Sequence, residues 1–203
     1  SAWVKRSDVS TNTNAIFAVG ASAGVDRGDI EFSSNQFLWE YNVSGTWYSA
    51  TTNAVYRDPS AWYHVVVAAD TTQATDTNRV KMYINGVQAA QSSSTQSFTY
   101  TGSQTIGKAL TSNAYYLNGN LSNFRIVNGV GVYTGNFTPA SAPLTTSAVG
   151  TSGANVASSI TGTVSLLTCR DSTLIDNSSN NYTITSGTTT VKPVMVSPFT
   201  PLG

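Results

Sequence analysis

Short apolar runs separated by small polar residues recur along the whole chain. They are rich in valine, isoleucine, threonine and aromatic residues, and asparagine, glycine, serine and aspartate interrupt them. No stretch shows the period of an amphipathic helix, so the pattern is typical of an all-β protein. The runs predict strands at Ala2–Lys5, Ala15–Val19, Asp29–Phe32, Phe37–Tyr41, Thr46–Ala50, Trp62–Ala69, Arg79–Ile84, Thr105–Gly107, Tyr115–Leu117, Leu121–Val127, Ser165–Cys169, Tyr182–Thr185 and Val194–Val196.

Residues that tolerate positive φ mark several turns between these strands. Asn85-Gly86 lies between two apolar runs, and this pair suits the two-residue type I′ turn of a β-hairpin. Val43-Ser44-Gly45 predicts a second short hairpin loop. Asn118-Gly119 and Asn128-Gly129 predict two further turns of the same kind.

The stretch from Tyr116 to Pro139 combines these signals, and we interpret it as two strands, each followed by an Asn-Gly turn, and an ordered loop. In the longer strand, Leu121 and Phe124 are three residues apart, which breaks the alternation of a regular strand. A bulge near Ser122-Asn123 would allow both side chains to face the core. A phosphate-binding glycine loop is not expected, because no helix follows.

The composition allows a large core but gives the surface an unusual character. The chain has 203 residues, which suits one large all-β domain or two small ones, and 40% of them are hydrophobic. Only 10% are charged, against roughly 25% in an ordinary soluble domain. Hydroxyl and amide groups must therefore keep the surface soluble, or other subunits must cover much of it.

Charge and hydropathy exclude two classes of partner. Ten basic and ten acidic side chains cancel, and the largest basic cluster is Lys5-Arg6, so we expect no nucleic-acid partner. No apolar run approaches the roughly 20 residues that span a bilayer, so no membrane insertion is expected. The chain begins at Ser1 inside a strand-like run, which we interpret as a cut or processed polypeptide or as an expression boundary.

Composition divides the chain into three parts. Residues 1–144 hold most of the predicted strands and are interpreted as one β-sandwich. Residues 145–164 are mainly serine, threonine, glycine, alanine, valine and asparagine and predict a linker or loop. Residues 165–203 form a β-rich tail, which we expect to complete the sandwich or to join a neighbour.

Several segments, in this order, resemble the laminin-G-like branch of the concanavalin A-like lectin/glucanase superfamily. They are Trp62–Val67, Val80–Val87, Ile106-Gly107 and Tyr116–Ile126. The resemblance implies a jelly-roll sandwich of two curved antiparallel sheets, and the many short strands favour the same fold. The flanking segment Val130–Pro139 is similar to domains in tail-fibre and other structural proteins of bacterial viruses.

The tail has a resemblance of its own. Leu166–Cys169 and Asp176–Ile184 resemble the opening of such a domain, whereas the start of this chain lacks that opening. The expectation is that Ser165–Val196 pairs with the sheet containing Ala2–Lys5, in the same chain or in a neighbour.

Two carboxylates on one predicted strand are the strongest candidates for catalysis. Asp29 and Glu31 alternate on one face, as do the carboxylates of related glucanases, whose pattern resembles E-x-D-x-x-E. Here Ser33 stands where the third group would follow, and no second acid is evident nearby. We therefore predict an exposed strand face and no enzyme. His64, the single histidine, is expected to be a hydrogen-bonded structural residue, and Cys169 a small buried one.

Two other groups of residues suit ligands. The resemblance implies a calcium ion at the sandwich rim, for which the candidate ligands are Asp171, Asp176 and Asn177, with Asp26 and Asp29 as a second pair. Ordinary Asp and Asn turns are the alternative explanation for both groups, and no other cofactor is expected.

The aromatic residues of one predicted hairpin suit a glycan. Trp47 and Tyr48 point to opposite faces of their strand, so one of them is expected to be exposed and available to a sugar. Alternation places Phe37, Trp39 and Tyr41 together on the packed face.

These observations favour a non-enzymatic structural or adhesion module of a bacteriophage particle, either in a tail fibre or as a capsid decoration. The expected location is the virion surface, and the expected partners are other virion subunits, copies of the same chain and host-surface glycans. A stand-alone carbohydrate-binding lectin domain is the first alternative, and a polysaccharide hydrolase or lyase is the second.

Overall fold

The computed structural model describes residues 1–10, 12–20, 26–92, 102–110, 115–147, 157, 159–187, 191–194 and 196–199. Within these residues the regular structure is β apart from one short 3-10 helix, which confirms the all-β prediction. The elements are β1 (Ala2–Arg6), β2 (Asn14–Gly20), β3 (Arg27–Ser33), β4 (Gln36–Val43), β5 (Thr46–Thr51), β6 (Tyr63–Ala69), η1 (Asp76–Asn78), β7 (Val80–Ile84), β8 (Val87–Ser92), β9 (Ser103–Ile106), β10 (Gly119–Ser122), β11 (Phe124–Asn128) and β12 (Thr163–Thr168).

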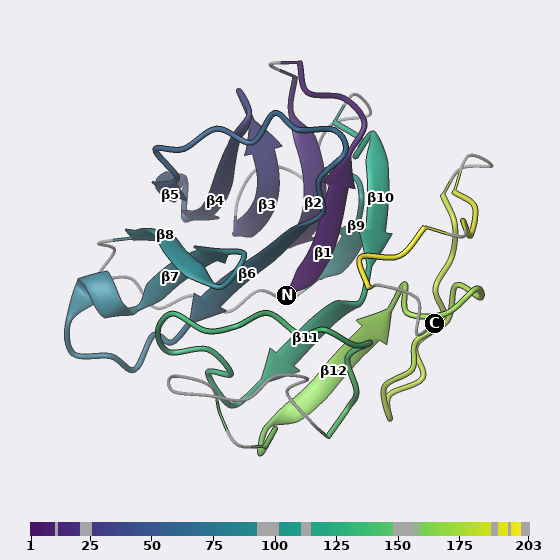
Figure 1. Ribbon diagram of the computed structural model, residues 1–203. Coiled ribbons are helices and arrows are strands. Elements are labelled where there is room, and N and C mark those ends of the chain that lie inside the picture. Colours follow the sequence, from purple (N-terminus) through teal and green to yellow (C-terminus); the bar gives the residue numbers. More distant parts are fainter. Residues whose placement is uncertain are drawn as a thin grey trace.

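Two antiparallel sheets make up the body of the molecule (Figure 1). Sheet A has the strand order β10-β1-β6-β7-β8, and sheet B has the order β5-β4-β3-β2-β9. Strands β11 and β12 pair with each other beside the start of β1 (Figure 1). The fold is the predicted two-sheet jelly-roll sandwich, in which each sheet buries one face against the other.

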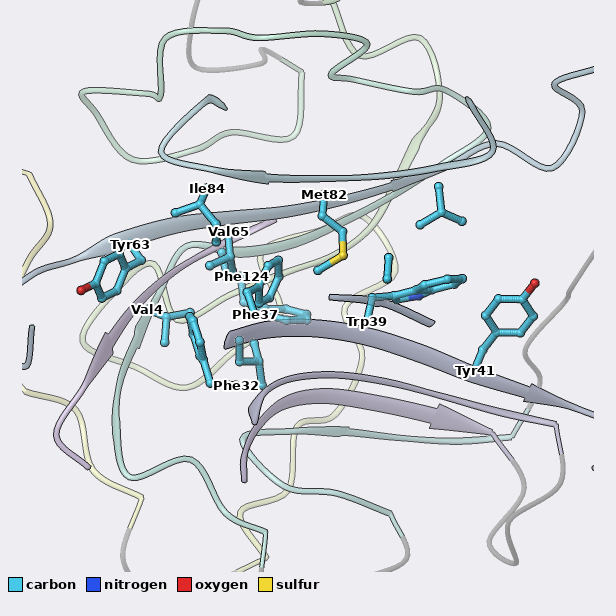
Figure 2. Close-up of a cluster of buried hydrophobic side chains, with 14 of the residues drawn as sticks. Val4, Phe32, Phe37, Trp39, Tyr41, Tyr63, Val65, Met82, Ile84 and Phe124 are labelled. Carbon is cyan, nitrogen blue, oxygen red and sulfur yellow. The ribbon is translucent and has the colours of Figure 1, made fainter. Parts of the chain in front are cut away.

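The core lies between the two sheets, as Figure 2 shows. Side chains of sheet A, such as Val65 and Met82, lie opposite Phe32 and Trp39 of sheet B. Alternation along each strand supplies this layer, because every second residue points inward. The predicted packing of Phe37, Trp39 and Tyr41 on one inner face is confirmed, since all three are buried in this cluster.

Three tight turns connect neighbouring strands. Ser44-Gly45 and Asn85-Gly86 both have positive φ at the two central positions, which confirms the two predicted hairpins. A third turn of this kind, Ser34-Asn35, joins β3 to β4 with φ values of 50° and 66°. It fixes which residues of β3 and β4 lie opposite each other.

The two other predicted Asn-Gly turns do not close hairpins. Gly119 belongs to β10 and pairs with Arg6, because only a glycine there lets the chain approach the Lys5 carbonyl. The strand predicted at Tyr115–Leu117 is reduced to one isolated bridge between Lys108 and Tyr116. Gly129, with a φ of 87°, follows the last residue of β11, but the chain continues there as an irregular segment.

The irregularity expected near Ser122-Asn123 is present as a break between β10 and β11. Asn123 has a φ of 52° and is buried, and its Oδ1 accepts a 2.7 Å hydrogen bond from the Leu144 amide. The break has the predicted consequence, because Leu121 and Phe124 both contact the core cluster.

Within the described part of the chain, the tail does not pair with the sheet that contains Ala2–Lys5, and pairing with that sheet of a neighbour stays a prediction. Strand β12 pairs with β11, because β10 and β6 already occupy the two edges of β1. The packing nevertheless joins β12 to the sandwich, since Leu166 is part of the core cluster. Tyr182–Thr185 and the described residues Val194 and Val196 are not strands, and Met195 lies outside the described residues.

A second layer covers the outer face of sheet A. Val66 and Tyr83 point away from the main core and pack against Val132 and Tyr133. The ring of Phe137 stacks on that of Tyr133 at a centroid distance of 4.0 Å. The irregular segment after β11 therefore gives sheet A a buried outer face.

Candidate functional site

Charged residues are rare in sheet B and gather on two neighbouring strands. Its five strands contain only four of them, Arg27, Asp29 and Glu31 on β3 and Glu40 on β4. The side chains on β3 point away from the sandwich core, because the alternate residues Ile30 and Phe32 face the core cluster, and Glu40 lies between Trp39 and Tyr41, which belong to that cluster. We call Arg27, Asp29, Glu31 and Glu40 the charged face.

The register between β3 and β4 places the carboxylate of Glu40 near those of Asp29 and Glu31. The pairing of β3 with β4 places Asp29 directly opposite Glu40 and Glu31 opposite Leu38. Directly opposite residues have Cβ atoms roughly 4.5–5.5 Å apart, and diagonal neighbours have Cα atoms roughly 7–8 Å apart. The sequence interpretation missed Glu40. A two-residue turn at Ser34-Asn35 would have revealed it, because counting outward from that turn pairs residue 29 with residue 40.

The charged face is shielded rather than exposed. Asp29 is 2% exposed and Glu31 is 8% exposed, so the predicted exposed strand face is wrong in this respect. The Arg27 Nε lies 3.1 Å from the Asp29 Oδ2 and forms an ion pair with it. Neither Asp29 oxygen accepts a hydrogen bond from the described residues.

Burial and mutual repulsion favour protonation of all three carboxyl groups. Burial, followed by repulsion from Glu40 and Asp29, raises the pKa of Glu31 to about 7. The pKa of Glu40 rises through burial and repulsion from Asp29. Burial raises the pKa of Asp29 as well, and the Arg27 guanidinium opposes that shift. A carboxyl group that titrates near neutral pH is able to give and take protons under ordinary conditions.

Trp47 extends this face toward β5. It lies opposite Asn42, which in turn pairs with Arg27 across β3 and β4. Its side chain is 45% exposed, and the Arg27 guanidinium carbon lies 4.8 Å from its ring centroid. Tyr48 points inward and stacks on Tyr41 at 5.1 Å. Of the two predicted sugar contacts, Trp47 therefore has the more accessible ring.

The residues predicted to bind calcium lie close together, but protein donors engage both aspartates. Asp176 is buried, and its carboxylate accepts hydrogen bonds from the amides of Leu167, Ser178 and Tyr182 and from the Ser178 hydroxyl. The Asn177 Nδ2 donates to the Asp171 Oδ2 at 3.1 Å. The contacts of Asp176 are those of a turn-forming aspartate, and calcium binding by this group stays a prediction.

The second predicted calcium pair is divided between two environments. The Oδ1 of Asp26 accepts a hydrogen bond from the Ser44 amide, which holds the β4–β5 hairpin against the start of β3. Asp29 is engaged by Arg27. Among the residues that the structure describes, no group of three or more histidine, cysteine, aspartate or glutamate side chains is arranged to hold a metal ion.

His64 is structural, but the expected hydrogen bonding is wrong. The side chain is fully buried under the layer that covers sheet A, in ring contact with Trp3, Tyr133 and Phe137. Neither ring nitrogen has a hydrogen-bond partner among the described residues. Burial, and then repulsion from neighbouring positive charge, lowers the pKa of His64 to about 3, so the imidazole is neutral at ordinary pH.

Cys169 is half-buried, not fully buried as expected. Its carbonyl accepts a hydrogen bond from the Asn123 amide, and burial raises the pKa of its thiol. The thiol therefore stays protonated and is a poor nucleophile.

The described part of the chain contains no helix long and apolar enough to cross a membrane.

The chain matches a family of known proteins. Residues 1–131 match the model of a family described as the concanavalin A-like lectin/glucanases superfamily. The match covers both five-stranded sheets and ends shortly after β11. No curated protein and no solved structure matches the chain.

Proposed function

The chain belongs to the concanavalin A-like lectin/glucanase superfamily, and from this premise we propose that it is an adhesion module in which Trp47, Arg27 and Glu40 contact a glycan. Its superfamily and its sandwich are those of carbohydrate-binding and structural modules. The module acts without breaking bonds. It presents a rigid sheet surface to a saccharide.

The observation that carries this proposal is the exposed ring of Trp47 beside a cluster of polar groups. Ligand sites combine aromatic surface with a few fixed polar groups that set orientation. Trp47 supplies the aromatic surface, and Arg27 and Glu40 supply charged groups on the adjoining strands. The strands of sheet B hold these groups rigidly, so little ordering is needed when a ligand binds.

We propose that the module is part of a bacteriophage particle, as a tail-fibre or capsid-decorating protein on the virion surface. The similarity of Val130–Pro139 to phage structural domains supports this setting. A charged fraction of 10% also suits a surface largely covered by neighbouring subunits. The partners are then other virion subunits, copies of this chain and glycans of the host surface.

A glycan array tests the adhesion function. The parent is expected to bind a defined subset of saccharides, and Trp47→Ala is expected to lose at least about tenfold in affinity. Tyr182→Ala is the matched control, because Tyr182 is an exposed aromatic residue outside both sheets. Equal binding by parent and Trp47→Ala would remove this face from recognition. Repeating the array with a chelator tests the predicted calcium ion.

Electron microscopy of virions with an antibody against the chain tests the setting. Labelling at regular positions on tail or capsid is expected. Absence of the chain from purified particles would contradict the phage assignment and would leave a stand-alone lectin domain as the alternative.

One observation favours a second function, a polysaccharide hydrolase. Glycosidases use two carboxyl groups, one of them with a raised pKa. Glu31 and Glu40 are diagonal neighbours on β3 and β4, and the pKa of each is raised. Against this function, Glu31 is only 8% exposed, so its carboxyl group offers little surface to a sugar.

Release of reducing ends from a panel of polysaccharides tests the hydrolase. We expect no release above background from the parent. Turnover that disappears in Glu31→Gln and in Glu40→Gln would show that the chain is an enzyme.

A further inference from the structure

The three carboxyl groups of the charged face share one cationic neighbour within sheet B. Strands β2, β5 and β9, which complete the sheet, carry no charged or histidine side chain. Arg27 forms its ion pair with Asp29, and its positive charge also favours the ionised forms of Glu31 and Glu40, so this one cation serves all three carboxyl groups. When all three carboxyl groups are ionised, the face holds two more negative than positive charges.

This excess lies in a region that disfavours it. Asp29 and Glu31 are almost completely shielded from water, and burial penalises the ionised form of a carboxyl group. Like charges on opposite and diagonal positions of paired strands repel each other as well. One added proton removes one negative charge and relieves both effects.

The titration tendencies agree with this geometry. The pKa values of all three groups are raised, and that of Glu31 reaches about 7. Groups that interact this closely titrate as a set, so the proton belongs to the trio and not to one residue.

Arg27 connects the trio to the surface. Its Nε is 3.1 Å from the Asp29 Oδ2, while its guanidinium carbon is 4.8 Å from the Trp47 ring centroid. The same cation therefore takes part in an ion pair and in a cation–π contact. Additional negative charge on the carboxyl groups strengthens the first contact at the expense of the second.

We propose that the charged face is a proton switch. Its three carboxyl groups hold one shared proton in mildly acidic solution and release it as the solution becomes alkaline. Arg27 transmits the change to Trp47, whose surroundings differ between the two states. The switch belongs to the face itself and operates with or without a bound saccharide.

The sign of the effect on stability follows from linkage. A carboxyl group whose pKa is raised by folding favours the folded state below its unfolded pKa, and this contribution is lost as the pH rises through the folded pKa. For Glu31 the stability is therefore lost over the pH range from 4.5 to about 7. The folding equilibrium constant is expected to fall by about 100-fold across it.

Urea denaturation of the whole chain at intervals from pH 5 to pH 8 tests the switch. The parent is expected to lose stability steadily, and Glu31→Gln, which keeps the shape of the side chain, is expected to lose much less. Asp76→Asn is the matched control, because Asp76 lies outside sheet B with a side chain that is 39% exposed, and it should follow the parent. A flat parent profile, or parallel profiles for parent and Glu31→Gln, would overturn the proposal.

Tryptophan fluorescence supplies a second readout that does not need unfolding. The difference between the parent and Trp47→Phe isolates the emission of Trp47 from that of the other three tryptophans. This difference is expected to change with a midpoint near pH 7 and to lose that transition in the Glu31→Gln background. A difference signal that is constant from pH 5 to pH 8 would refute the link through Arg27.

Discussion

The outer faces of the two sheets are built in opposite ways. The outer face of sheet A is covered by the chain itself, and Tyr83 lies there beneath Tyr133 and Phe137. The outer face of sheet B carries ionisable groups and the exposed ring of Trp47. One face is therefore a second interior, and the other is a surface suited to ligands.

The charges of the strands follow the same division. The strands of sheet A carry Lys5, Arg6 and Lys81 and no acid, whereas those of sheet B carry three acids and Arg27. All the acidic groups within the paired strands of the two sheets are thus on the charged face. An excess of acidic groups on one side of the sandwich favours the approach of ligands with positive charge.

The contrast also shows that surroundings decide the role of a titratable residue. His64 has an ordinary pKa close to neutral, but under the covering layer it stays uncharged. Glu31 ordinarily ionises well below neutral pH, but on the charged face its pKa is about 7. Of these two residues, the glutamate is therefore the one whose titration reaches neutral pH.

The largest expected effect comes from opening the covered face. Tyr133 is 3% exposed and stacks on Phe137, so Tyr133→Ala leaves a cavity between the layer and sheet A. The loss of stability should be about 3–5 kcal/mol by urea denaturation. The exposed Tyr182 gives the control, and Tyr182→Ala should change stability by no more than about 0.5 kcal/mol. Similar small losses of stability in both variants would mean that the covering layer does not pack tightly against sheet A.

A smaller effect is expected from a matched pair of glycines in the two sheets. Gly86, with a φ of 82°, turns between β7 and β8, and an added Cβ would collide with the Phe137 carbonyl of the covering layer. Gly45, with a φ of 88°, turns between β4 and β5 with open space around it. Gly86→Ala should cost about 2–3 kcal/mol and Gly45→Ala about 1 kcal/mol, as measured by urea denaturation. Equal losses of stability in the two variants would show that the covering layer moves aside for the added Cβ at little cost.

The smallest effect on stability is expected at Trp47. Because the side chain is 45% exposed and lies outside the core cluster, Trp47→Ala should change the free energy of unfolding by less than about 1 kcal/mol. Thermal and urea denaturation measure this change. A loss as large as that of Tyr133→Ala would mean that Trp47 is structural, which would contradict its place in a binding surface.

The strands and the tight hairpins could be predicted from the sequence because their signals are local. Alternation placed Trp39 and Tyr41 in the core, and Asn85-Gly86 showed a type I′ turn. The broken alternation between Leu121 and Phe124 located an interruption at Asn123. Each of these features depends on residues that are adjacent or nearly adjacent in the chain.

The features that were missed depend on contacts between distant or aperiodic segments. The covering layer comes from residues 130–137, which have no strand or helix period to show which face they contact. The hydrogen bonds expected for His64 are absent among the described residues because aromatic rings surround it. Asn118-Gly119 matched a turn, but a close approach to Lys5 explains that glycine. The proximity of Glu40 to Asp29 could have been predicted from a two-residue turn at Ser34-Asn35. The residues of that turn, however, are weaker hairpin signals than Asn-Gly.

The contrast between the two outer faces can be measured directly by nuclear magnetic resonance of the labelled chain with a saccharide selected on the glycan array. Backbone signals of β3, β4 and β5 around Trp47 are expected to shift on titration, while those of β6 and β7 around His64 stay unchanged. Shifts centred on β6 and β7, or no shifts at either face, would contradict the assignment of the charged face as the functional surface.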